Sequence, residues 1–435
     1  MDLLFANDRR GAFPPSLYAE GITDTARPAL RGESRADVVV VGAGLTGLSA
    51  ALHLARVGRR VIVLEAHRAG FGASGRNGGQ VGSGQRLEVD DLERMVGRIA
   101  SRRLWDMAEE AKALTRDLAA PANVPFHPGI AHAARTQSEV RHAHAIAEKL
   151  ARDYGYDKVQ PLDREGLRAL VRSDAYIGGD VDRGAGHLDP LALTLGLARQ
   201  AEAAGALIHE LSHVHRITHA DRAGGTSIVQ AGHGRVICDH VILAANGYLG
   251  GLDDRIAARV MPINNFVIAT EPLGKRANDV LCENVAAHDT RFVVNYWRLD
   301  DARRLIFGGG ENVSYRFPRD IAGKVKWAML QVYPQLHDVK ITHAWGGTLA
   351  ITMTRLPVFT RPAPNCLSAS GYSGHGVALA NLAGKLMAQA VQGQSDGFDT
   401  MAALPQPSFP GGVAFRWPLL VAGMSWYSLR DRLGV

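Results

Sequence analysis

Three glycines near the start of the chain and a glutamate after them have the types and spacing of a ligand site. Gly42, Gly44 and Gly47 follow the apolar residues 38–41 directly, and a helical pattern begins at Leu45. Gly42 permits a tight turn, Gly44 lets backbone amides approach a pyrophosphate, and Gly47 lets the helix pack closely on the strand. Glu65 ends the next apolar run, where its carboxylate accepts hydrogen bonds from a ribose 2′-hydroxyl. The sequence therefore predicts a dinucleotide site that also includes Ala43, Leu45, Thr46 and Ala66, with the helix N-terminus facing the phosphates.

Two further glycine groups lie far apart in the chain. The loop 70–84 combines clustered glycines with Arg76 and Asn77, and linkers seldom have that composition between structured elements. The turn 371–376 contains His375 and directly precedes a helical pattern, so its amides can face a polar group of a ligand. We expect both groups to contact the same cofactor.

The hydrophobic pattern predicts the elements that position these groups. Strands are expected at 37–41, 61–64, 206–214 and 239–245, with helices at 45–56, 87–118, 138–154 and 187–204 and a polar segment at 163–183. Because helices separate the strands of the first set, those strands should pair in parallel. Runs at 265–270, 291–297 and 304–307, the last ended by the glycines 308–310, indicate an antiparallel sheet. A strand, the glycine turn and a long helix at 365–390 should return to the first sheet.

These elements predict an α/β protein in which a Rossmann-like FAD-binding domain, with a mixed but mainly parallel sheet, carries an inserted substrate domain built on an antiparallel sheet with helices. FAD is favoured over NAD because a nucleotide fold assembled from both ends of the chain suits a cofactor that is buried along its length. The expected division is an N-terminal leader at 1–35, an FAD-binding domain at 36–90, 185–255 and 341–400, a substrate domain at 91–184 and 256–340, and a tail at 401–435.

Composition excludes several classes of protein. The 435 residues are 46% hydrophobic and 21% charged, with a net charge of +6 and no long basic run, so we expect no nucleic-acid partner. The cysteines, Cys238, Cys282 and Cys366, are few and far apart, which argues against disulfides and against a metal site. The polar N-terminus is unlike a secretory signal and no long apolar span occurs, so a cytoplasmic location is expected. The aromatic segment 415–433 is expected to dock as a helix, with weak membrane association as the alternative.

Three segments resemble the D-amino-acid oxidase and sarcosine oxidase superfamily, most closely its γ-glutamylputrescine oxidase branch. They are residues 73–80 (ASGRNGGQ), 345–357 (WGGTLAITMTRLP) and 371–385 (GYSGHGVALANLAGK). The resemblance runs over nearly the whole chain and implies FAD as the cofactor. It places Val214 on the adenine side and the other cofactor contacts at Ser74, Gly75, Arg76, Asn77, Gly78, Gly79, Gln80, Ala245, Asn246, Gly247, Gly371, Tyr372, Ser373, Gly374, His375 and Gly376. Arg76 would stabilise negative charge on the reduced flavin.

Two positions depart from the superfamily pattern. Ile351 stands where sarcosine oxidases carry the cysteine that attaches FAD, so we expect a non-covalent cofactor. Leu349 stands where glycine oxidase-like enzymes place an arginine that clamps the substrate carboxylate. The absence of that clamp argues against a plain α-amino acid, unless Arg298 or Arg355 takes over the task.

The resemblance implies an amine oxidase, in which flavin removes a hydride from the carbon beside nitrogen, water hydrolyses the imine, and O2 reoxidises the flavin to give hydrogen peroxide. The candidate catalytic residues are Tyr296, Trp345 and His375. The expected substrate is a γ-glutamylputrescine-like secondary amine or N-substituted amino compound, with an iminodiacid or N-alkyl glycine as second choice. Arg255 and Arg259 are candidate cations for the reaction with O2. The alternatives are a dehydrogenase that reduces a quinone and a flavin-binding protein without turnover; the oligomeric state is left open.

Overall fold

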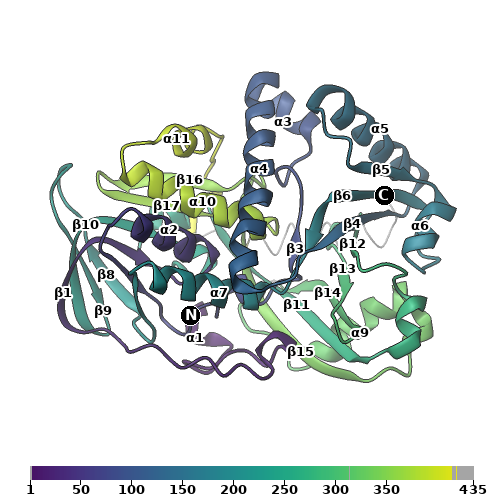
Figure 1. The fold of residues 1–435 in the computed structure, drawn as a ribbon, viewed down its shortest axis with the longest axis horizontal. Coiled ribbons are helices and arrows are strands. Elements are labelled where there is room, and N and C mark those ends of the chain that lie inside the picture. Colours follow the sequence, from purple (N-terminus) through teal and green to yellow (C-terminus); the bar gives the residue numbers. More distant parts are fainter. Residues whose placement is uncertain (1, 313, 414–417, 419–435) are drawn as a thin grey trace.

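The computed structural model describes residues 2–312, 314–413 and 418. Two groups of strands lie on either side of the long helix α4 (Arg98–Ala119) in the view of Figure 1. Within the described residues, these strands form one sheet of eight strands and one of nine. The expected fold class is confirmed: a mixed, mainly parallel sheet flanked by helices, and a second, mainly antiparallel sheet.

The first sheet has the strand order β16-β17-β10-β1-β2-β7, and the β8–β9 hairpin pairs with β10. β1 pairs in parallel with β2 and β10, and β10 pairs in parallel with β17, as the sequence predicts. The strands are β1 (Arg31–Val41), β2 (Val61–Leu64), β7 (Leu207–His209), β8 (Val214–Thr218), β9 (Ser227–Ala231), β10 (His233–Leu243), β16 (Val358–Ala363) and β17 (Cys366–Ser370).

The apolar run of β1 is buried on both faces, which explains why it does not alternate with polar residues. Val38 and Val40 pack into the core that includes α2 (Leu45–Arg56), α7 (Pro190–Ala203) and α10 (Gly376–Val391). Val39 and Val41 face the opposite side, where they pack with residues of β8 and β9. The chain therefore enters the Gly42 turn from the four buried residues 38–41 at the carboxyl end of β1.

The second sheet has the order β15-β11-β14-β13-β12-β4-β6-β3, with β5 paired to β6. Its described neighbours are antiparallel except for β12 and β4, which run parallel. The strands are β3 (Gln80–Val81), β4 (His127–Ala134), β5 (Val159–Leu162), β6 (Gly178–His187), β11 (Met261–Pro272), β12 (Ala286–Asp289), β13 (Tyr296–Leu299), β14 (Arg304–Asn312) and β15 (Ile341–Ile351).

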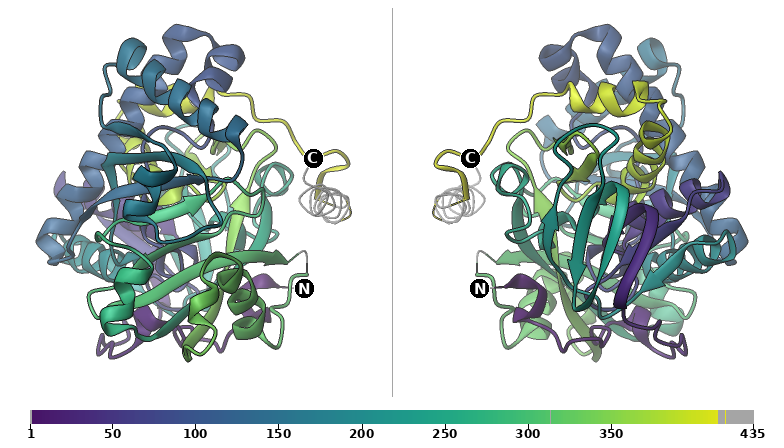
Figure 2. Two further views of the ribbon diagram at one scale, coloured as in Figure 1. Left: turned by 90° about the vertical axis from the view of Figure 1, so that its right-hand side faces the viewer. Right: turned by 90° about the vertical axis from the view of Figure 1, so that its left-hand side faces the viewer.

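Helices cover this second sheet on its outer side (Figure 2). α9 (Ile321–Val332) contacts β11, β14 and β15, while α5 (Gln137–Tyr154) and α6 (Arg164–Leu170) contact β6. The remaining α-helices are α1 (Leu3–Ala6), α3 (Val89–Val96), α8 (Asp254–Ala257) and α11 (Asp396–Ala402). Short 3-10 turns lie at Leu17–Ala19, Ala73–Gly75, Ala120–Ala122, Asn246–Tyr248, Gly274–Asp279 and Pro334–Leu336.

Several expected boundaries are wrong. β1 begins at Arg31, inside the expected leader; the helix at 87–118 divides into α3 and α4 at Gly97, whose φ is +82°. The strand at 206–214 is two strands, β7 and β8, and the polar segment 163–183 contains α6 and part of β6.

The strand expected at 291–297 is wrong in its first part, since only its last two residues belong to a strand, β13. Residues 290–295 form a turn between β12 and β13, because the Asp289 carboxylate accepts hydrogen bonds from the amides of Arg291 and Asn295. The glycines 308–310 do not end β14, which continues through them to Asn312.

The division into an FAD-binding and a substrate domain remains a proposal. β15 hydrogen-bonds to β11 in the second sheet, so we propose a boundary after residue 351 in place of the one expected before 341. Within the part of the chain that the structure describes, no helix is long and apolar enough to cross a membrane. The segment 415–433 lies outside the described residues, apart from Pro418.

Candidate functional site

A cavity of about 1250 Å³ lies where the two sheets meet. Its walls come from segments far apart in sequence: the N-terminus of α2, the loop 71–80, the N-terminus of α10, and residues of β4, β12, β13 and β15. The predicted residues that line it are Gly42, Gly44, Leu45, Thr46, Glu65, Ala66, Ser74, Asn77, Gly78, Gln80, Val214, Ala245, Asn246, Gly247, Tyr296, Tyr372, Ser373, Gly374, His375 and Gly376. The other predicted residues, Ala43, Gly47, Gly75, Arg76, Gly79, Trp345 and Gly371, are buried in the surrounding wall.

The glycine turn after β1 leaves no room for side chains. A Cβ on Gly47 would lie 2.0 Å from the Gly42 carbonyl oxygen, and a Cβ on Gly44 would lie 2.7 Å from Ser74 Oγ. Gly42 has a φ of +105°, which disfavours any other residue. Since Gly44 provides no side-chain cap, the first turn of α2 presents amides to the cavity, the arrangement that binds phosphate.

Glu65 is held at the end of β2 by two backbone amides. Its carboxylate oxygens accept hydrogen bonds from Ala43 N at 2.8 Å and from His67 N at 2.9 Å. Burial raises the pKa of Glu65, against the lowering effect of these amide bonds. The carboxylate lines the cavity beside the glycine turn, where it can accept further hydrogen bonds from ribose hydroxyls.

Hydrogen bonds join the three glycine groups into one site. Ser74 Oγ accepts a bond from Leu45 N at 3.0 Å, and the hydroxyls of Thr46 and Tyr372 lie 2.7 Å apart. Asn246, with a φ of +47°, accepts a bond from Gly371 N at 2.9 Å through its Oδ1. The turn 371–376 is thereby fixed against both α2 and the end of β10.

These groups fit FAD. The N-termini of α2 and α10 both open on the cavity without a cap from the side chain of the N-cap residue, one beside Glu65 and Ser74 and the other beside residues 82–84. A dinucleotide needs amides for its pyrophosphate and a carboxylate for its ribose, and the flavin carbonyl edge suits a second helix N-terminus.

Tyr296 lies against two glycines of the cavity wall. A Cβ on Gly308 would be 2.0 Å from its ring, and a Cβ on Gly78 would be 2.7 Å from it. Its hydroxyl donates to Asn265 Oδ1 at 2.6 Å, so the ring is clamped beside the loop that is expected to contact the flavin. Gly308 has no room for a side chain because the tyrosine ring crosses β14 there, and a Cβ on Gly309 would lie 2.6 Å from Asn295 Oδ1.

His375 lines the cavity at the N-cap of α10. Its Nε2 lies 3.1 Å from the carbonyl oxygen of Gly84. Burial, and then the positive charge of Arg86, lower the pKa of His375 to about 4, so the imidazole is neutral at ordinary pH.

Arg76 and Trp345 face away from the cavity. The Arg76 guanidinium donates to the carbonyl oxygens of Phe71 and Gly346 and forms an ion pair with Asp8 at 2.9 Å. Trp345 Nε1 donates to the Arg76 carbonyl oxygen at 2.9 Å. In the structure both side chains hold the loop 71–80 against β15, and neither lines the space where a flavin ring would lie.

The arginines considered for substrate or O2 lie in different environments. Arg298 is buried and donates to the Gly78 carbonyl oxygen at 2.9 Å, outside the cavity lining. Arg255 pairs with Asp253 and Arg259 donates to Gln406, again outside the lining. Arg355 does line the cavity, with its guanidinium 5.6 Å from the centre of the Phe292 ring.

Sequence reasoning missed the polar residues at the far end of the cavity. Arg86, His132, His142 and His288 line it together with Glu88. They come from a loop, two strands and a helix, so only the strand register brings them together. No local motif in the sequence marks them.

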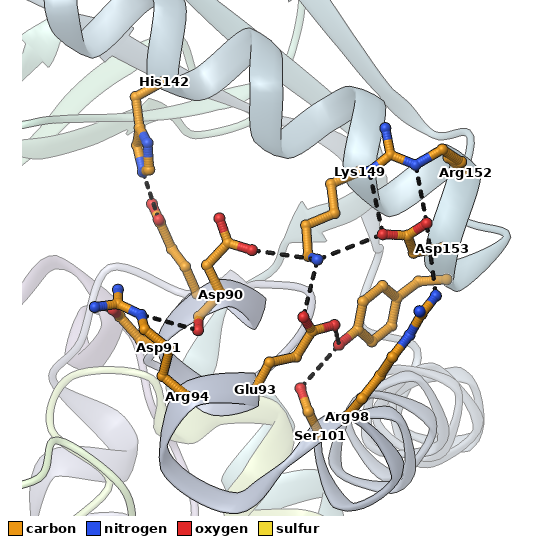
Figure 3. Close-up of polar contacts among 12 residues, drawn as sticks. Asp90, Asp91, Glu93, Arg94, Arg98, Ser101, His142, Lys149, Arg152 and Asp153 are labelled. Carbon is orange, nitrogen blue, oxygen red and sulfur yellow. Dashed lines mark hydrogen bonds and ion pairs between the residues drawn. The ribbon is translucent and has the colours of Figure 1, made fainter.

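A network of charges holds the rim of this far end. Lys149 of α5 pairs with Asp90 and Glu93 of α3 at 3.3 and 2.9 Å and with Asp153 at 3.4 Å (Figure 3). Glu88, directly before α3, pairs with His142 of α5. The network fixes α3 against α5 beside the cavity opening.

The site geometry and fold agree with the comparisons with known proteins. Residues 37–390 match the model of the DAO family, described as FAD dependent oxidoreductase. The chain belongs to this family. It is 41% identical over 411 residues to the probable oxidoreductase OrdL of Rhizobium meliloti, covering 93% of this chain and 94% of that one. It is 38% identical over 403 residues to the γ-glutamylputrescine oxidoreductase of Escherichia coli, with 92% and 93% covered.

Among solved structures, the glycine oxidase of Geobacillus kaustophilus aligns with a TM-score of 0.73 at 20% identity, over 86% of this chain and all of that one. An iminodiacetate oxidase from Chelativorans aligns with a TM-score of 0.67 at 18% identity, over 82% and 95%. At these identities the likeness shows the fold alone. The chain is therefore an FAD-dependent oxidoreductase of the amine and amino-acid oxidase type, and the expected family, cofactor and enzyme class are confirmed.

Proposed function

We propose that this enzyme oxidises a secondary amine or N-substituted amino compound, with a γ-glutamylputrescine-like amine as first choice and an iminodiacid or N-alkyl glycine as second. The observation that carries the first choice is the 38% identity to a γ-glutamylputrescine oxidoreductase along 92% of the chain. Leu349 supports it, because an apolar side chain lines the cavity where a clamp for an α-carboxylate is expected.

When bound, FAD would supply the acceptor for a hydride from the carbon beside nitrogen, and water would then hydrolyse the imine. The chain must hold the amine in its neutral form with that C–H bond facing the cofactor. Tyr296 offers an aromatic face for an alkyl amine, and neutral His375 adds no positive charge to this part of the cavity. Trp345 and Arg76 are positioning residues in this proposal, because they act through the loop that Tyr296 touches.

We further propose that FAD is bound without a covalent bond and that O2 reoxidises it to give hydrogen peroxide. Ile351 lines the cavity at the position of the attachment cysteine. The three cysteines lie elsewhere: Cys238 and Cys366 are buried in the core beside β9 and β10, and Cys282 is exposed.

The test is aerobic turnover of the purified FAD-loaded enzyme with a panel of amines, following O2 uptake and peroxide together. With N-acyl diamines as substrates, we expect one molecule of hydrogen peroxide to form for each molecule of O2 consumed. Turnover in air without peroxide, accelerated by a soluble quinone, would instead identify a dehydrogenase. If no amine in the panel bleaches the flavin under anaerobic conditions, the flavin-binding protein without turnover is the correct reading.

A further inference from the structure

One row of polar side chains crosses the floor of the cavity on the second sheet. The register pairs Asp180 with His132, His132 with His288, and His288 with Tyr296. Register partners on neighbouring strands project from the same face of a sheet. His132, His288 and Tyr296 all line the cavity, and the His132 and His288 rings lie 5.0 Å apart. The row therefore runs from the loop at Gly78 to the far end of the cavity.

The pKa values of the two histidines are shifted in opposite directions. Burial lowers the pKa of His132, but the hydrogen bond to Asp180 and the negative charges of Asp180, Glu88 and Asp289 outweigh burial, so its pKa is raised. The bond to Asp180 uses Nδ1, at 3.4 Å, which leaves Nε2 as the nitrogen that can donate to a bound group. Burial, and then the charges of His132, Arg86 and His375, hold the pKa of His288 well below its usual range. The pKa of His132 thus lies above its usual range, and that of its neighbour His288 lies well below it.

Apart from Asp180, which His132 itself contacts, the acids whose charges act on His132 are engaged by other groups. Asp289 accepts hydrogen bonds from Asn295, from Tyr176 and from Arg291. Glu88 is paired with His142. The cation Arg86 lines the same part of the cavity and acts on both His288 and His375. A bound anion here would meet the guanidinium of Arg86 and the imidazoles of His132 and His288.

We propose that Arg86, His132 and His288 form an anion subsite that binds a substrate carboxylate remote from the oxidised carbon. His132 lies two strands away from Tyr296, and at about 4.8 Å for each strand the separation is about 10 Å. Three backbone-type bonds span about 3.5 Å, so nine bonds between the oxidised carbon and the carboxylate carbon span about 10 Å when extended.

This inference rests on the proposed function and selects between its two substrate classes. In glycine, N-alkyl glycines and iminodiacids, the carboxylate is separated from nitrogen by a single carbon, so it cannot reach the anion subsite while that carbon lies by the cofactor. An amine linked through an amide to a terminal carboxylate fills both ends of the cavity. The substrate class is therefore an N-acyl diamine with a carboxylate about nine bonds from the oxidised carbon.

The experiment compares two amines that differ only at the remote end: N-glutaryl-1,4-diaminobutane, which carries the carboxylate, and its terminal carboxamide. KM and kcat are measured for both by peroxide formation with the FAD-loaded enzyme. A charge-assisted bond predicts a KM at least about ten-fold lower for the carboxylate, with similar kcat. H132N and R86Q should each remove most of that preference, while H337N, at an exposed histidine outside the cavity lining, keeps it.

The preference should also fall as pH rises through the raised pKa of His132, because the imidazole then loses its proton. Equal KM values for the two amines with the unaltered enzyme would overturn the subsite while leaving the amine oxidase proposal intact. A preference that survives in both H132N and R86Q, with flavin content retained, would also overturn it. If neither amine reduces the flavin but an N-alkyl glycine does, the first-choice substrate is wrong as well.

Discussion

Replacing Arg76 by methionine tests whether its side chain stabilises the fold or stabilises negative charge on the reduced flavin. Its side chain is 2% exposed, and it pairs with Asp8, whose side chain is 12% exposed, while donating to the carbonyl oxygens of Phe71 and Gly346. Its guanidinium also lies 4.4 Å from the centre of the Phe71 ring. Breaking a buried pair of this kind costs about 3–5 kcal/mol of unfolding free energy. At about 2 °C for each kcal/mol, the unfolding midpoint should fall by roughly 6–10 °C.

The assay is thermal unfolding of the FAD-loaded protein, followed by circular dichroism and by flavin fluorescence. R60M is the matched control: Arg60 pairs with Asp37 at 2.8 Å, but its side chain is 71% exposed, so the loss should stay below about 1 kcal/mol. The double variant R76M/D8N should be less destabilised than the two single variants together, because the pair is lost only once. An unchanged midpoint with a shifted flavin reduction potential would refute this reasoning and restore the role that the sequence indicates, stabilisation of reduced flavin.

Three further outcomes are expected. G47A should prevent FAD binding, since its Cβ would lie 2.0 Å from the Gly42 carbonyl oxygen. A flavin absorbance spectrum of normal intensity in the purified variant would contradict this. The pKa of His375 is about 4 in the folded protein, against an ordinary 6.5, so between these two pH values the unfolded chain binds a proton at this imidazole and the folded chain does not. The residue therefore lowers the stability of the fold as pH falls from 6.5 to about 4, and H375N should flatten that part of the stability profile. Acid precipitation should release the flavin into the supernatant, and flavin retained in the pellet would show a covalent bond, against the expectation from Ile351.

The parts of the site that the sequence predicts are those whose chemistry is local. Gly42, Gly44 and Gly47 follow one another in a single turn, and the steric reason for each glycine acts within that turn or against the next strand. Glu65 ends a strand adjacent to β1, so its place follows from the parallel pairing. These positions line or support the cavity as their spacing indicates.

The remaining parts depend on contacts between distant segments. His132 and His288 meet only through the register of β4 and β12, which no pattern in either strand records. Arg298 is an ordinary strand residue in the sequence, yet its guanidinium is bound to the Gly78 carbonyl oxygen behind the cavity wall. The turn at 290–295 has the apolar and aromatic residues of a strand, but the Asp289 side chain binds its amides instead. Strand register decides the first case, and side-chain hydrogen bonds to the backbone decide the other two.

The central claim is that an amine with a remote carboxylate reduces FAD bound in this cavity. The most direct measurement mixes the oxidised enzyme anaerobically with N-glutaryl-1,4-diaminobutane, and with N-methylglycine in a separate series, and follows flavin absorbance at about 450 nm. We predict complete bleaching by the N-acyl diamine, at a rate that saturates with its concentration, and slow or no bleaching by N-methylglycine. Saturable bleaching by N-methylglycine alone, or no bleaching by either amine, would contradict the account.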